Sequence, residues 1–107
     1  MEEQRTVTLW SANGLTVTAR RGLDDNLVIS GQDLRPNPLV SGEVTEYEYG
    51  LSVGRSDIPA VLAALRAAPD ADVLDVLENA GPELVKIGES RWLAGIGVEA
   101  DFWSSSE

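Results

Sequence analysis

The stretch VTEYEYGLSVGRSDIPAVLAAL, residues 44–65, contains the change of period that decides the fold. Up to Val53 the residues alternate as in a β-strand, and we expect one side of it to face the core: Thr45, Tyr47, Tyr49, Leu51 and Val53. After Gly54 the apolar residues recur with the period of a helix instead: Ile58, Val61, Leu62 and Leu65. A strand therefore gives way to a helix at this point.

The residues before this stretch predict further strands, which together occupy residues 5–53. RTVTLWSANGLTVTARRG, residues 5–22, is typical of a hairpin, because Asn13-Gly14 separates two β-rich runs and both residues accept positive φ. Residues 27–34 predict a third strand, kinked near Gly31. Residues 35–43 contain two prolines and a glycine, which indicates a loop.

The residues after the stretch predict a helical part over residues 56–97. The first helix starts at Ser56 or Asp57 and ends at Ala67-Ala68-Pro69. A second short helix covers residues 70–81, with Asp70 or Asp72 as its N-cap and Gly81 as its end. Within residues 82–97, Ser90 is the expected cap of a last short helix, and residues 98–103 alternate as a fifth strand would.

Strands followed by helices are typical of an α+β fold. We therefore expect one domain over residues 1–107, with an antiparallel sheet of four to five strands and two to three short helices packed on one face. The length fits a single domain, and no repeat or linker divides the chain.

The composition excludes several classes of function. The chain has no cysteine and no histidine, so thiol nucleophiles, zinc-thiolate sites and the commonest general base are absent. We expect a protein that is not an enzyme and that needs no cofactor. The formal net charge of −10 disfavours nucleic acid and anionic membranes as partners and favours a basic protein. Without a signal-peptide core or a long apolar run, a cytoplasmic location is expected.

The negative charge is concentrated in one part of the chain. Residues 1–40 carry five acids against four bases, whereas residues 41–107 carry thirteen acids against four bases. Nine of the ten net negative charges therefore lie after residue 40. The expected partner-binding residues come from a strand and from the second helix: Glu43, Glu46, Glu48, Asp70, Asp72, Asp75 and Glu78.

Each of these groups also has a simpler interpretation. Glu46 and Glu48 can be a solvated outer face of their strand, and acids near the start of a helix favour its dipole. The spacing of Asp70, Asp72 and Asp75 does not fit a calcium loop, since a leucine occupies the next ligand position, so no metal site is expected. We expect Trp103 to lie in the core. The alternative is that it anchors a partner at the rim of a binding surface.

Five fragments carry a resemblance to known proteins: SGQDL at 30–34, EYEYGLSV at 46–53, DIPAVLAAL at 57–65, DVLDVLE at 72–78 and DFWS at 101–104. They resemble small acidic proteins of actinobacterial type, some of which are similar to the immunity proteins of contact-dependent toxin systems. The resemblance implies a stoichiometric inhibitor that occludes a basic site on a cognate toxin domain. The alternative is a non-catalytic housekeeping binding module whose acidity only keeps it soluble.

Overall fold

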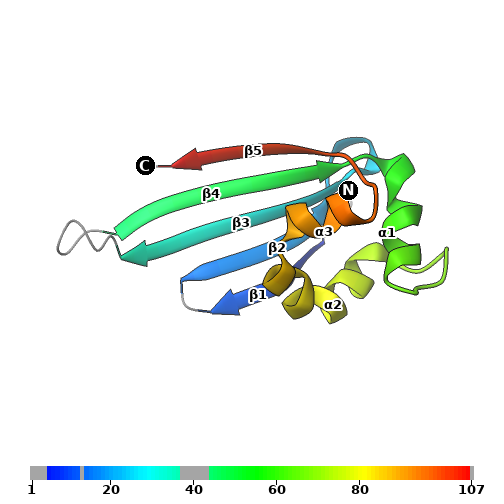
Figure 1. Cartoon of the computed structure of the whole chain (residues 1–107), viewed down its shortest axis with the longest axis horizontal. Helices are drawn as coiled ribbons and strands as arrows, with labels where there is room; N and C mark the ends of the chain where they lie inside the picture. The colour runs from blue at the N-terminus through cyan, green and yellow to red at the C-terminus, as the bar shows by residue number, and fades with distance from the viewer. Residues whose placement is uncertain (1–4, 13, 37–43, 107) are drawn as a thin grey trace.

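The chain folds as one antiparallel sheet covered by helices on one face (Figure 1). The computed structural model describes residues 5–12, 14–36 and 44–106, with backbone only for 23, 34–36, 44–46 and 105–106. The described part contains five strands that lie in the sheet in chain order: β1 (Thr6–Ala12), β2 (Leu15–Arg21), β3 (Leu27–Pro36), β4 (Val44–Val53) and β5 (Ala100–Ser106). Every neighbouring pair is antiparallel. The predicted α+β fold is confirmed.

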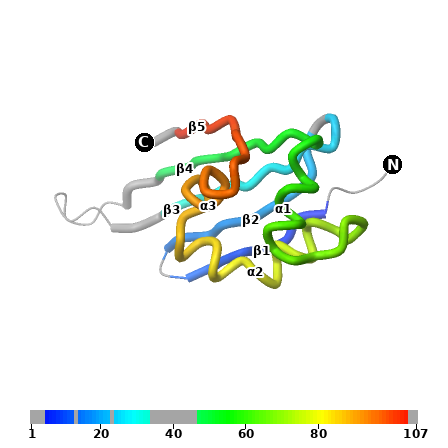
Figure 2. The backbone as a smooth tube through the Cα atoms, turned by 45° about the vertical axis from the view of Figure 1, so that its right-hand side comes forward, coloured from blue at the N-terminus to red at the C-terminus, as the bar shows by residue number. Residues whose placement is uncertain are grey.

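The helices connect β4 to β5 and form the second layer (Figures 1 and 2). They are the short 3₁₀ helix η2 (Arg55–Asp57), α1 (Ile58–Ala64), α2 (Val73–Ile87) and α3 (Glu89–Gly95). A second 3₁₀ helix, η1 (Leu23–Asp25), lies between β2 and β3. The longest helix, α2, packs on β1. None of the described helices combines the length and apolar character that crossing a membrane demands.

The core lies between these two layers. Alternate side chains of a strand point to one face, and the helix-facing ones are apolar and buried: Val7, Leu9, Val17, Ala19, Leu27, Ile29, Leu51 and Val53. They pack against the inner faces of the helices and the connection to β5: Ile58, Val61, Leu62, Val73, Leu74, Leu77, Leu84, Leu93 and Val98. The other face of the sheet carries no helix and is mainly polar.

The helices cover only one end of the sheet, and this corrects the prediction for β4. Leu51 and Val53 are buried, as expected, but Tyr49 is only half-buried and Tyr47 is 37% exposed. The start of β4 and the end of β3 extend beyond the helical layer (Figure 1). The helix-facing side of β4 therefore belongs to the core only in the second half of the strand.

The second helix is longer than predicted, because Gly81 does not end it. A Cβ at Gly81 would lie 2.5 Å from the carbonyl oxygen of Leu9, so the missing side chain lets α2 approach the backbone of β1. The helix continues through Pro82 and stops at Gly88, whose φ of 101° suits glycine. The predicted N-cap Asp72 is confirmed, since the N–H of Leu74 donates to its side chain at 2.9 Å.

Smaller differences concern the ends of elements. α1 stops at Ala64, before the predicted Ala67-Ala68-Pro69, and Arg66 adopts a positive φ of 59°. Ser90 does not cap α3, because Gly88 precedes the helix and Glu89 is its first residue. No register shift occurs at Gly31; the shift lies in β1, between Thr8 and Trp10. The hairpin is confirmed, although Asn13 lies outside the described residues. The last strand is also confirmed, but it covers Ala100–Ser106 instead of residues 98–103.

Candidate functional site

The acidic residues predicted to bind a partner do not form one surface. Glu48 lies on the helix-free face of β4 and accepts a hydrogen bond of 3.3 Å from Gln32 Nε2. Glu46 belongs to β4, but its side chain is not described, and Glu43 lies outside the described residues. The acids numbered 70–78 belong to the helical layer. The sheet therefore separates Glu48 from the acids of the helical layer, and binding by either group stays a prediction.

Two of the helical acids have a local partner. The Arg5 guanidinium lies 3.0 Å from Asp72 and also pairs with Asp75, and each of the three side chains is about half-exposed. The hydrogen bond with Asp75 raises the pKa of Arg5. Exposed ion pairs are screened by solvent and contribute little to stability. Asp72 and Asp75 thus hold the start of β1 against α2, and part of their charge is compensated within the chain.

Exposed aromatic side chains gather instead along β5. Phe102 is 56% exposed and Trp103 is 48% exposed, so the expectation that Trp103 lies in the core is wrong. Successive residues of a strand point to opposite faces. Phe102 points to the helix side, where its ring centroid lies 6.4 Å from that of Tyr49, and Trp103 points to the helix-free side. Both faces of the edge strand therefore present an aromatic ring.

A glycine beneath Trp103 fixes where its ring lies. Gly50 of β4 is the partner of Trp103 in the register, and a Cβ at Gly50 would lie 2.3 Å from Cε2 and Nε1 of the indole. The ring therefore rests on the backbone of β4. It also borders a shallow hollow of about 360 Å³ on the helix-free face, together with Thr18, Arg20 and Glu48.

Tyr49 lies in the middle of a row of three aromatic rings on the helix side, formed by Tyr47, Tyr49 and Phe102. Its hydroxyl donates a 2.9 Å hydrogen bond to Oε1 of Glu89, the first residue of α3, which is only 8% exposed. Burial, followed by the negative charge of Glu89, raises the pKa of Tyr49. The Tyr49 ring occupies the space that a Cβ at Gly31 would need, at 2.2 Å. Tyr47 continues the row, with its ring centroid 6.0 Å from that of Tyr49.

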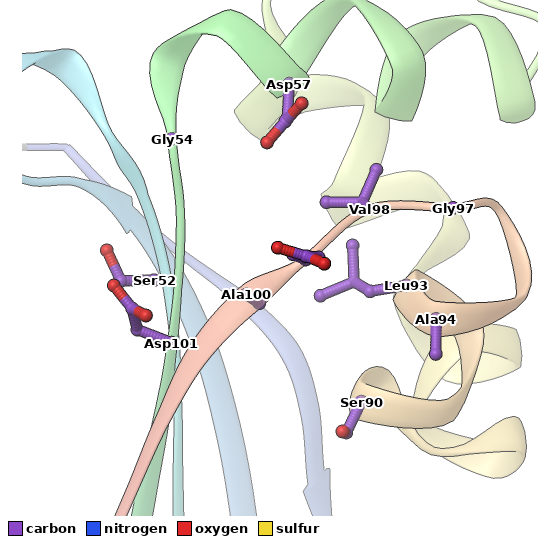
Figure 3. A pocket seen from close by; sticks show the side chains of 11 residues that line it. Ser52, Gly54, Asp57, Ser90, Leu93, Ala94, Gly97, Val98, Ala100 and Asp101 are labelled. Atoms are coloured by element: carbon purple, nitrogen blue, oxygen red, sulfur yellow. The ribbon is translucent and has the colours of Figure 1, made fainter.

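Acidic side chains surround the start of β5. A hollow of about 760 Å³ lies where η2, α3 and the first residues of β5 meet (Figure 3), and Asp57, Glu99 and Asp101 line it. Among the residues that the structure describes, none of these carboxylates forms an ion pair. Carboxylates that form no ion pair among the described residues thus lie beside the exposed aromatics.

We call Asp57, Glu99, Asp101, Phe102 and Trp103 the β5 surface. In residues 5–12, 14–36 and 44–106, no group of three or more Asp or Glu side chains is placed to hold a metal ion. The β5 surface combines aromatic rings, which dominate the energetics of protein interfaces, with carboxylates that attract basic groups. Such an arrangement can bind a protein.

One pattern in the sequence points to this surface. VEADFW alternates acidic and apolar residues on a strand near the end of the chain, which marks Trp103 as a candidate anchor but does not single out Phe102. Periodicity assigned Phe102 to a strand but could not show that its face extends beyond the helices.

Comparisons with known proteins return no relatives: no family model, no curated protein and no solved structure matches this chain.

Proposed function

We propose that this chain is a stoichiometric, non-catalytic binding protein of the immunity type, which neutralises a toxin domain by covering a basic site on it. The observation that carries the proposal is the β5 surface, where Phe102 and Trp103 are about half-exposed beside carboxylates that have no ion pair among the described residues. Large exposed aromatics of this kind mark binding surfaces more often than isolated apolar residues do.

The charge of the whole chain supports the same partner. A net charge of −10 accelerates association with a basic protein and repels nucleic acid that the toxin domain would otherwise bind. Sites that act on nucleic acid are basic, so a negatively charged inhibitor matches them in sign. The absence of histidine and cysteine from the sequence is compatible with an inhibitor, because occlusion requires no reaction.

The test is whether the gene next to this chain's gene encodes a toxin domain that this chain neutralises. Co-expression should restore growth to cells that produce the toxin domain, and the purified proteins should form a one-to-one complex. Because the attraction is electrostatic, association should slow at least severalfold when salt rises from about 50 mM to about 500 mM. Continued cell death and no complex at low salt would exclude the proposal and leave the housekeeping module as the alternative.

Variants locate the interface. Phe102→Ala and Trp103→Ala should each weaken the complex by about tenfold to a hundredfold, as expected for aromatic anchors. Ile87→Ala is the matched control, because Ile87 is also an exposed large apolar residue (49%) but ends α2, which packs on β1 at the other edge of the sheet. Equal losses for all three variants would argue against the β5 surface.

A further inference from the structure

The two edges of the sheet differ in their ability to accept another strand. β1 is irregular, since its register shifts between Thr8 and Trp10, and α2 lies against its backbone at Leu9. β5 pairs with β4 over all seven residues without a shift, and it contains no proline. Bulges and covering elements protect an edge from further pairing, whereas a regular strand without them leaves its outer groups open. β5 is therefore the open edge.

The hydrogen-bond pattern of the sheet shows which β5 groups are open. The N–H of Gly22 donates to the carbonyl of Asn26 at 2.8 Å, so these two residues form a hydrogen-bonded pair. In an antiparallel ladder, such pairs alternate with pairs that exchange no hydrogen bonds. Along β2 and β3 the hydrogen-bonded pairs therefore include Arg20 with Val28 and, further along, residues 18 with 30.

The alternation of hydrogen-bonded and non-hydrogen-bonded pairs continues across the sheet, because no register shift interrupts the pairing of β3, β4 and β5. A residue bonded to one neighbouring strand points its N–H and C=O away from the other. Ile29 is therefore bonded to Leu51, and Ser52 and Gly50 are bonded to Asp101 and Trp103. Alternate β5 residues point their backbone N–H and C=O outward: Ala100, Phe102, Ser104 and, at the end of the strand, Ser106.

We propose that β5 receives an extended basic segment of the partner as a sixth strand, paired through the backbone of Ala100, Phe102 and Ser104; this rests on the proposed function. The side chains of Phe102 and Trp103 flank the added strand, one on each face. Glu99 and Asp101, which have no ion pair among the described residues, attract its Lys or Arg side chains. Backbone pairing supplies affinity, and the flanking side chains supply selectivity.

Charge argues for a basic segment and against a second copy of this chain. Pairing of two β5 strands would bring together two copies of Glu99 and Asp101, on chains that each carry a net charge of −10. Like charges on adjacent strands are unfavourable, whereas a basic strand reverses the sign of the interaction. A dimer that forms through β5 would contradict the proposal and is visible in the same measurements.

The probe is a synthetic peptide as long as β5 in which lysine alternates with valine or threonine. Addition to the ¹⁵N-labelled chain should give saturable NMR shifts centred on Ala100, Phe102 and Ser104 and slow the exchange of those three amide protons. The same peptide with glutamate in place of lysine should have no effect. Shifts centred elsewhere, equal binding of both peptides, or no shifts at all would overturn strand addition.

A pair of variants separates backbone pairing from other contacts. Ser104→Pro removes an outward N–H, which costs no hydrogen bond within the sheet, whereas Ser104→Ala keeps that N–H. Ser104→Pro should weaken lysine-peptide binding at least fivefold, and Ser104→Ala should leave it within twofold. If Ser104→Pro does not fold, the peptide's effect on amide exchange in the unaltered chain shows whether a strand is added to β5. Toxin neutralisation with no response of β5 would overturn strand addition and leave the proposed function standing.

Discussion

The hydroxyl of Tyr49 lies 2.9 Å from Oε1 of Glu89 and donates a hydrogen bond to it, which ties the middle of β4 to the first turn of α3. Glu89 is the one charged residue among the described residues that is buried. The contact lies at the boundary between the helix-covered end of the sheet and the exposed row of aromatic rings.

Removal of this hydroxyl should destabilise the fold. Tyr49→Phe leaves the Glu89 carboxylate without its partner, and we expect the free energy of unfolding to fall by about 1–3 kcal/mol. Glu89→Gln should cost less, because the amide oxygen still accepts the hydrogen bond and no charge is buried. Urea unfolding measures both variants, and a Tyr49→Phe protein as stable as the original chain would show that the bond contributes nothing.

The same contact should make stability sensitive to alkaline pH. Burial and the Glu89 charge raise the pKa of Tyr49 above its ordinary value of 10.0, so the folded state holds this proton more tightly than the unfolded chain. The stability that protonated Tyr49 contributes is complete below about pH 10. Above that pH the free energy of unfolding decreases, by less than about 1.4 kcal/mol per pH unit. Urea unfolding between about pH 9 and pH 11 should show this decline, and Tyr49→Phe should lessen it.

Gly81 and Gly95 should respond oppositely to alanine. A Cβ at Gly81 would lie 2.5 Å from the Leu9 carbonyl oxygen, so α2 must move, and we expect a loss of about 1–3 kcal/mol despite the better helix propensity of alanine. A Cβ at Gly95 meets no atom within 4 Å, so Gly95→Ala should be neutral or stabilise by up to about 1 kcal/mol. Thermal unfolding distinguishes the two, and similar effects would contradict the packing of α2 on β1.

Gly31 and Gly50 each lie beneath an aromatic ring, but only one ring is held in place. Gly31→Ala should destabilise the fold, because the Tyr49 ring above it is bonded to Glu89. Gly50→Ala displaces only the exposed Trp103 ring, so we expect a stability change within about 1 kcal/mol and weaker partner binding. Unfolding and binding experiments on both variants check this, and the reverse order of stability would disprove it.

Neutralised carboxylates test which acids meet the partner. The double variant Glu99→Gln, Asp101→Asn should slow association at least about threefold at low salt, because both acids belong to the β5 surface. Asp72→Asn with Asp75→Asn removes the same charge but disturbs acids already paired with Arg5, so the association rate should change less. Stopped-flow measurements compare them, and a larger effect of the second double variant would restore the α2 acids as the binding site.

Much of the fold could be predicted from local patterns. The Asn13-Gly14 hairpin, the change of period after Gly54 and the cap at Asp72 depend on residues close together in the sequence, and each prediction is confirmed where the structure describes it. The prediction that Gly81 ends the second helix is wrong for the same reason. Its lack of a side chain matters because of Leu9, which is far away in the sequence, and no local pattern reports such a contact.

The sequence by itself determined the class of the fold, the order of its strands and helices, and the excess of negative charge. Only the tertiary structure decided where that charge lies and which aromatic rings stay exposed. The reason is that alternation assigns a side chain to one face of a strand, whereas burial depends on whether a helix covers that face. The helices reach Leu51 and Val53 but not Tyr47 or Phe102, and the sheet places Glu48 and Asp72 on opposite sides.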